Sequence, residues 1–292
     1  MRGKGGDTML YYGMLTAAVT MFGVQFWFNQ RYQRISGSSM GAAFRFALLS
    51  NLTGLLCLLI INGFSFAVTP FTLVMALLAA LNSLLYTFCS LKAFAHINLS
   101  LYSIFAMLGG MLLPFVAGVL FFEEEMTLAK GICVVLIVVA LALTVERGER
   151  KSGAVYYAGV FVLNGFSGVL SKIFQAAPYA KTNAASYSVW IALCSVALSG
   201  VVLCVLWRQW QFPNGAALLY TAGYGSINKV ANFLLLLALA ALPASVQYPF
   251  VTGGTMIVSC VISLLGGQRP TLKEWSAVGL SLGGILILVF FA

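Results

Sequence analysis

Residues 98–122 read NLSLYSIFAMLGGMLLPFVAGVLFF, and this run carries no charged side chain. A helix of about 20 apolar residues is long enough to cross the hydrocarbon core of a bilayer. The rest of the chain has the same character, because 61% of its 292 residues are apolar and only 8% are charged. A soluble globular domain has about 25% charged residues. The composition therefore excludes an ordinary soluble domain and predicts a membrane protein.

Nine further apolar runs flank this one, and charges, Pro or Gly separate them. Each run is long enough to cross the bilayer as a helix, and the alternating pattern of a barrel strand is absent. The sequence therefore predicts an all-α integral membrane protein with a short N-terminal tail, residues 1–8. The ten predicted spans are 9–29, 39–62, 70–95, 98–122, 127–145, 153–176, 184–208, 214–240, 243–266 and 271–291.

The chain also repeats itself at a constant offset along its length. Matching pairs include Tyr11-Tyr12 with Tyr156-Tyr157, Gly23-Val24 with Gly168-Val169, and Ser100, Phe105, Gly109 and Met111 with Ser245, Phe250, Gly254 and Met256. The two halves, 9–146 and 153–292, hold five spans each. Because five is odd, the second half enters from the opposite side, which predicts a 5+5 inverted-topology repeat around a central cavity. This design is typical of secondary transporters that work by alternating access.

One turn carries a resemblance to a known family. Phe121-Phe122-Glu123-Glu124-Glu125-Met126-Thr127-Leu128, followed by Gly131 and an apolar run, resembles the acidic turn between spans four and five of EamA-type members of the drug/metabolite transporter superfamily. The second copy, Gly266-Gly267-Gln268-Arg269-Pro270-Thr271-Leu272, lacks the usual glutamate. The resemblance implies a ten-span transporter whose substrate is an amino acid, drug, sugar phosphate, nucleotide sugar or small amine.

Charged residues inside the predicted spans are basic. The seven acids, Asp7, Glu123, Glu124, Glu125, Glu146, Glu149 and Glu274, lie in the tail, in connections or at span ends. Drug–proton exchange through a buried carboxylate is therefore not expected. Arg45 and Lys172 lie close enough to span ends to reach the interface. Lys229 lies near the middle of span 214–240, where a charge needs a partner or a water-filled cavity. Both a substrate role and hydrogen bonding to carbonyls stay open for it.

Polar stripes at helical spacing mark candidate cavity faces. They are Thr16, Thr20, Gly23, Trp27 and Gln30 in the first span, Asn82 and Tyr86 in the third, Asn164, Gly168, Ser171 and Gln175 in the sixth, and Tyr248, Thr252, Thr255, Ser259 and Ser263 in the ninth. Such stripes avoid lipid and face either a cavity or a neighbouring helix. We predict a substrate-binding set of Lys229, Asn228, Asn232, Asn164, Tyr248, Trp27, Tyr86 and Arg45.

Two transport hypotheses follow. In the first, Lys229 meets the carboxylate or phosphate of a small anionic or zwitterionic metabolite, such as an amino acid or a phosphorylated metabolite. In the alternative, an aromatic-lined cavity carries cationic or aromatic compounds by cation–π contact. The alternative requires Trp27, Tyr86 or Tyr248 to line the cavity and Lys229 to point away from it.

The remaining features narrow the function further. The six cysteines and His96 show no metal-ligand spacing, so neither a metal nor a cofactor is predicted. The sequence shows no convergent acid–base set, so an enzyme is not predicted. No phosphate-binding ATPase loop is present, so a gradient must drive transport. The predicted partners are a small-molecule substrate, the lipid bilayer and, as an open alternative, a coupling ion (H+ or Na+). Nucleic acid is not expected, and the oligomeric state stays open, with a monomer as one option. The predicted location is the cell (plasma) membrane, multi-pass.

Overall fold

The computed structural model describes residues 4–97, 99–123, 125–144, 153–206, 212–266 and 271–291. Within these ranges the chain forms ten helices, which confirms the predicted all-α architecture. The helices are α1 (Lys4–Ser36), α2 (Met40–Ile61), α3 (Pro70–Phe94), α4 (Leu99–Phe121), α5 (Leu128–Thr144), α6 (Ala154–Ala176), α7 (Ala184–Val205), α8 (Gly215–Leu239), α9 (Ala244–Leu265) and α10 (Leu272–Phe291).

Helix ends agree with the predicted spans to within three residues, except in the first. There α1 begins inside the predicted tail and continues seven residues past position 29 to Ser36. The helix continues because residues 30–36 contain no Gly or Pro, and it ends where Gly37 adopts a φ of 75°. Side-chain caps explain several other ends, since Ser39, Thr69, Asn183 and Asn214 each accept a hydrogen bond from the first turn of the next helix.

Seven of the described helices are long and apolar enough to cross a membrane: α1, α2, α3, α6, α7, α8 and α9. Within α4 and α5, the described residues give shorter apolar segments, Phe105–Phe121 and Leu128–Ala140. These lengths and compositions indicate a multi-pass integral membrane protein.

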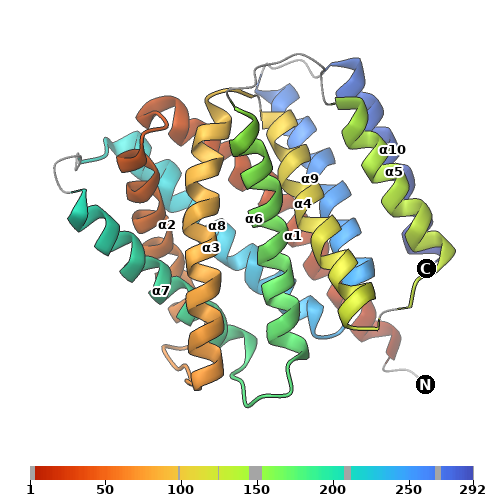
Figure 1. Ribbon diagram of the computed structural model, residues 1–292, viewed down its shortest axis with the longest axis horizontal. Coiled ribbons are helices and arrows are strands. Elements are labelled where there is room, and N and C mark those ends of the chain that lie inside the picture. The colour runs from red at the N-terminus through yellow and green to blue at the C-terminus, as the bar shows by residue number, and fades with distance from the viewer. Residues whose placement is uncertain are drawn as a thin grey trace.

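The helices mostly pack against partners from the other half of the chain. Figure 1 shows α5 beside α10 at one end of the molecule and α2 with α7 at the other, with the remaining helices between them. Besides the α5–α10 pair, the most extensive contacts join α1 with α8 and α9, α4 with α6 and α9, α3 with α6 and α7, and α2 with α7 and α8. Each half therefore buries its faces largely against the other half.

One close approach brings α4 against α6. A Cβ built at Gly109 would overlap the carbonyl oxygen of Phe161 and lie 2.7 Å from its Cα. A Cβ at Gly165 would in turn overlap the carbonyl oxygen of Gly109. Two glycines therefore let the backbones of α4 and α6 touch, as small residues do in membrane helix pairs.

A threonine cluster joins α3 to the connection between α6 and α7. Thr72 is fully buried. Its Oγ1 accepts a hydrogen bond from the backbone N–H of Thr182 at 3.1 Å and lies 2.8 Å from Oγ1 of Thr69 and 3.2 Å from Oγ1 of Thr182. The cluster thus links the two halves of the chain near the start of α3.

We expect Thr72→Val to lower the melting temperature of the detergent-purified protein, because the N–H of Thr182 then loses its acceptor. A buried unsatisfied donor costs about 1–3 kcal/mol. The control is Thr16→Val, since the exposed Thr16 hydroxyl donates only to the carbonyl of Tyr12 in its own helix. Equal melting temperatures for the two variants would contradict the assigned role of Thr72.

Candidate functional site

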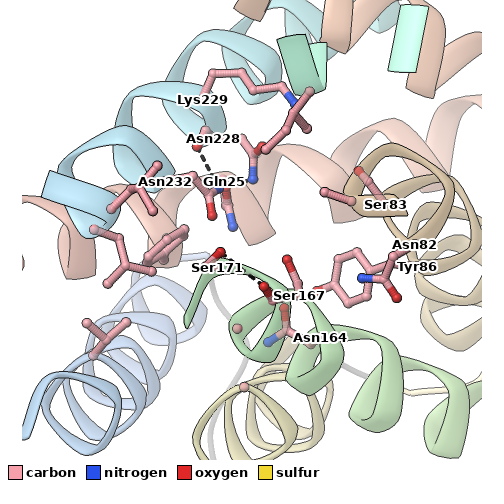
Figure 2. A pocket seen from close by; sticks show the side chains of 18 of the residues that line it. Gln25, Asn82, Ser83, Tyr86, Asn164, Ser167, Ser171, Asn228, Lys229 and Asn232 are labelled. Carbon is pink, nitrogen blue, oxygen red and sulfur yellow. Dashed lines mark hydrogen bonds between the residues drawn. The ribbon is translucent and has the colours of Figure 1, made fainter. Parts of the chain in front are cut away.

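A pocket of about 170 Å³ lies among seven helices. Its lining comes from α1, α3, α4, α6, α7, α8 and α9, whereas no described residue of α2, α5 or α10 lines it. Figure 2 shows groups of α1 and α8 on one side, facing groups of α6 and α3 on the other. The amide, lysine and serine side chains in the lining are Gln25, Asn82, Ser83, Asn164, Ser167, Ser171, Ser188, Asn228, Lys229 and Asn232.

The pocket brings together most of the predicted substrate-binding set. Lys229, Asn228, Asn232, Asn164, Tyr248 and Tyr86 all line it. Trp27 and Arg45 do not. Trp27 stacks instead under the guanidinium of Arg31, whose Cζ lies 5.3 Å from the ring centroid. Arg45 is buried beside the phenol of Tyr32, near the turn between α1 and α2.

Lys229 supplies the only charged group in the described lining of the pocket. It lies near the middle of α8 and is half-buried. Among the described residues, none forms a hydrogen bond or an ion pair with its Nζ. The acids whose side chains are described, Glu123 and Glu125, are exposed in the α4–α5 connection. A membrane-buried ammonium without an acid is costly alone and favours an anionic ligand.

Two amides flank the lysine and connect α8 to α1. Asn228 donates from Nδ2 to Oε1 of Gln25 at 2.7 Å, and Gln25 is 4% exposed. Asn232 donates to the backbone carbonyl of Asn228 at 2.8 Å. Figure 2 shows Gln25, Asn228 and Asn232 on the same side of the pocket as Lys229. This side therefore presents one cation and a set of neutral amides.

Gln25 was not in the predicted set because the stripe chosen in the first span lies on another face of α1. Thr16 and Thr20 of that stripe are exposed and donate to carbonyls of their own helix. A hydroxyl satisfied in this way needs no cavity. The sequence signal that could have identified Gln25 is its spacing with Asn29, because residues four apart share one helix face. In the structure both side chains are buried.

The other stripes are only partly in the pocket. In α6, Asn164, Gly168 and Ser171 line it, whereas Gln175 donates to the carbonyl of Leu236 at 3.4 Å. In α9, Tyr248 and Thr252 line it. Further along α9, Thr255, Ser259 and Ser263 are buried in the packing outside the pocket. Some residues of each of these two stripes thus line the pocket, whereas others lie in contacts with neighbouring helices.

Interhelical hydrogen bonds hold the lining in place. Asn82 donates to the carbonyl of Leu163 at 2.8 Å, and Asn164 donates to the carbonyl of Ala106 at 2.6 Å. Tyr248 and Thr252 donate to carbonyls of α6 and α4, those of Gly168 and Met107, each at 3.0 Å. The four bonds join α3 to α6, α6 to α4, α9 to α6 and α9 to α4. These side chains therefore position the wall of the pocket.

An aromatic layer bounds the pocket at Tyr86. The hydroxyl of Tyr86 lies 2.7 Å from that of Tyr102, which also pairs with the hydroxyl of Ser90. The ring of Tyr102 stacks on Phe94, with centroids 3.9 Å apart, and meets the edge of Phe26. The hydroxyl of Tyr86 thus anchors the residue to this layer, and its side chain lines the pocket.

The lining of the pocket carries groups that can bind a small molecule. The described residues contain no group of three or more His, Cys, Asp and Glu side chains that could hold a metal ion. The lining combines one cation, neutral amides and hydroxyls, and aromatic rings. Such a site can hold a small molecule that carries a negative charge and hydrogen-bonding groups.

Comparison with known proteins supports the fold. No family model and no curated protein matches the sequence. A solved structure described only as "Crystal structure of protein" is similar along almost the whole chain. It superposes with a TM-score of 0.69 at 15% sequence identity, and the match covers 98% of each chain. At this identity the similarity shows a shared fold alone.

Proposed function

We propose that this protein is a secondary active transporter of a small, polar, negatively charged or zwitterionic metabolite. The observation that carries the proposal is Lys229, a cation that lines a pocket halfway along an apolar helix without an acidic partner in the described part of the chain. In this proposal its ammonium binds the carboxylate or phosphate of the substrate. Asn228, Asn232 and Asn164 orient the rest of the molecule.

Alternating access through an inverted repeat is part of the same proposal. The extensive helix pairs include α1–α8, α3–α6, α2–α8 and α3–α7. When each helix of α1–α5 is exchanged for its counterpart in α6–α10, the pair α1–α8 becomes α6–α3 and the pair α2–α8 becomes α7–α3. The pairs α2–α7, α4–α9 and α5–α10 convert into themselves. This correspondence supports ten spans arranged as two inverted halves, with the pocket between them.

The acidic turn at Glu123 and the ten-helix fold also favour membership of the drug/metabolite transporter superfamily, EamA type, in the cell membrane. Transport would be driven by the substrate gradient or by a coupled ion, H+ or Na+.

The size of the pocket favours small substrates within that superfamily. Pockets for drug-sized ligands measure about 300–1,000 Å³, whereas this one measures about 170 Å³. An amino acid or a short phosphorylated metabolite is therefore a better fit than a nucleotide sugar.

The alternative, transport of cationic or aromatic compounds, draws support from the aromatic side chains in the lining, among them Phe22, Tyr86 and Tyr248. Two observations count against it. Lys229 lines the same pocket and repels a cationic ligand. Trp27, the strongest cation–π candidate, lies outside the pocket.

A thermal-shift screen of the detergent-purified protein tests the proposal. One panel holds amino acids, short sugar phosphates and nucleotide sugars, and a second holds quaternary and aromatic amines. A ligand at 100 times its dissociation constant stabilises the folded protein by about 2.7 kcal/mol. We expect stabilisation by members of the first panel only. Stabilisation by amines alone would overturn the proposal in favour of the alternative.

A further inference from the structure

A notch in α2 receives the aliphatic stem of Lys229 where α2 packs against α8. A Cβ built at Gly54 of α2 would overlap Cγ of Lys229 and lie 3.2 Å from its Cβ. The same Cβ would lie 2.7 Å from the carbonyl oxygen of Gly225. The lysine stem therefore occupies the space that any side chain at position 54 would fill.

A second glycine, one turn earlier on α8, sets the distance between the two helices. A Cβ at Gly225 would overlap the carbonyl oxygen of Ser50 in α2 and lie 2.7 Å from its carbonyl carbon. Gly225 and Lys229 are four residues apart and share one face of α8, as Ser50 and Gly54 share one face of α2. The contact at Gly225 brings the backbones together, and this approach places Gly54 directly under the lysine stem.

The notch affects the pocket although α2 does not line it. No described residue of α2 lines the pocket, yet α2 holds the stem of the one lysine that does. A lysine stem packs readily along an apolar surface while its ammonium remains in a polar environment. The four-carbon stem of a lysine is otherwise flexible. The packing of this stem therefore decides where Nζ lies.

We propose that Gly54 is a positioning residue, which holds the ammonium of Lys229 at the wall of the pocket and so fixes where the anionic group of the substrate binds. This inference rests on the proposed function, in which Lys229 binds that group. A methyl group at position 54 would push the stem away from α2 and so displace Nζ from its present position.

A double-mutant cycle tests the notch without any ligand. Gly54→Ala is made in the wild-type chain and in Lys229→Ala, where no Cγ remains to overlap. We expect Gly54→Ala to lower the melting temperature more in the wild-type background, by about 2 °C or more. An equal loss in both backgrounds would mean that Gly54 serves only the approach to Gly225, and would overturn the proposal.

A second readout follows the amine itself. Sulfosuccinimidyl acetate acetylates accessible lysines, and mass spectrometry compares Lys229 with the exposed Lys273 in the same sample. We expect Gly54→Ala to change the Lys229-to-Lys273 ratio by about threefold or more. Equal acetylation of Lys229 in wild type and Gly54→Ala, at any level, would overturn the proposal.

Two matched glycine variants control for packing. Gly23→Ala places a methyl group against the side chain of Val258, whose Cβ lies 2.9 Å away, at a contact of α1 with α9 that involves no lysine. Gly200→Ala places a methyl group where no described atom beyond its own helix backbone lies within 4 Å. Both should leave the Lys229-to-Lys273 ratio unchanged, and a matching change in Gly23→Ala would overturn the assignment. Because neither readout uses a substrate, failure of the notch is distinguishable from failure of the transport proposal.

Discussion

Replacing Lys229 with methionine is expected to weaken binding of the anionic ligand found in the screen by about 30-fold or more. Removing one partner of a buried charge pair costs about 2–5 kcal/mol, and each 1.4 kcal/mol is tenfold in affinity. Methionine keeps much of the aliphatic length of lysine, so the packing against Gly54 persists while the charge is lost. Ligand titrations followed by thermal shift, and uptake into proteoliposomes, measure the effect.

The matched control is Lys172→Met. Lys172 also lies in an apolar helix, but it is outside the pocket, and its Nζ lies 5.5 Å from the ring centroid of Phe122. We expect its ligand affinity to stay within about twofold of wild type, since surface and interfacial charges contribute little. Normal transport by Lys229→Met would refute the proposed role of the ammonium. An affinity loss of the same size in both variants would indicate that net charge, rather than the position of Lys229, governs binding.

Gly109→Ala is expected to cause the largest loss of stability among single methyl additions to the glycines described above. The added Cβ would overlap the Phe161 carbonyl oxygen and lie 2.6 Å from the Phe161 carbonyl carbon. A backbone carbonyl within a helix cannot rotate away, so α4 and α6 must separate. Overpacking costs about 1–3 kcal/mol and occasionally more, and a clash with a backbone carbonyl belongs at the upper end of that range. The variant should show a sharply lower melting temperature in detergent, or should fail to purify as a monodisperse protein.

The control for this variant is Gly131→Ala in α5, where a Cβ meets no described atom beyond its own helix backbone within 4 Å. Because alanine favours helix over glycine by up to about 1 kcal/mol, this control should melt at the wild-type temperature or slightly above it. Equal melting of Gly109→Ala and wild type would show that α4 and α6 do not approach as closely as described.

The number of helices and most of their ends could be predicted because they depend on local sequence. Apolar length, Gly and Pro decide where a membrane helix begins and ends, and these are read residue by residue. The α1 error shows the limit of that reasoning. Residues 30–36 are mostly polar, and a hydropathy argument ends the span there, whereas the backbone stays helical until Gly37.

The site residues that could be predicted are likewise those that local sequence identifies, whereas the others depend on how the helices pack. Lys229 could be found from sequence because a charge in the middle of an apolar run is conspicuous wherever the helix faces. Gln25, by contrast, depends on the rotation of α1, and Trp27 two residues later lies outside the pocket. Gly54 depends on the distance between two helices. The nearest signal in the sequence was the small-residue pair Ser50 and Gly54, which indicates close packing but not what is packed.

The packing of each half against the other has a consequence for how the protein is made. Gln25 and its hydrogen-bond partner Asn228 are 203 residues apart. Ribosomes add about 5–20 residues per second, so the polar face of α1 waits roughly 10–40 seconds for α8 to be synthesised. During this interval the first half has inserted, but its buried amides lack their final partners. Until the second half arrives, the amide of Gln25 therefore needs a different hydrogen-bond partner or a place away from lipid.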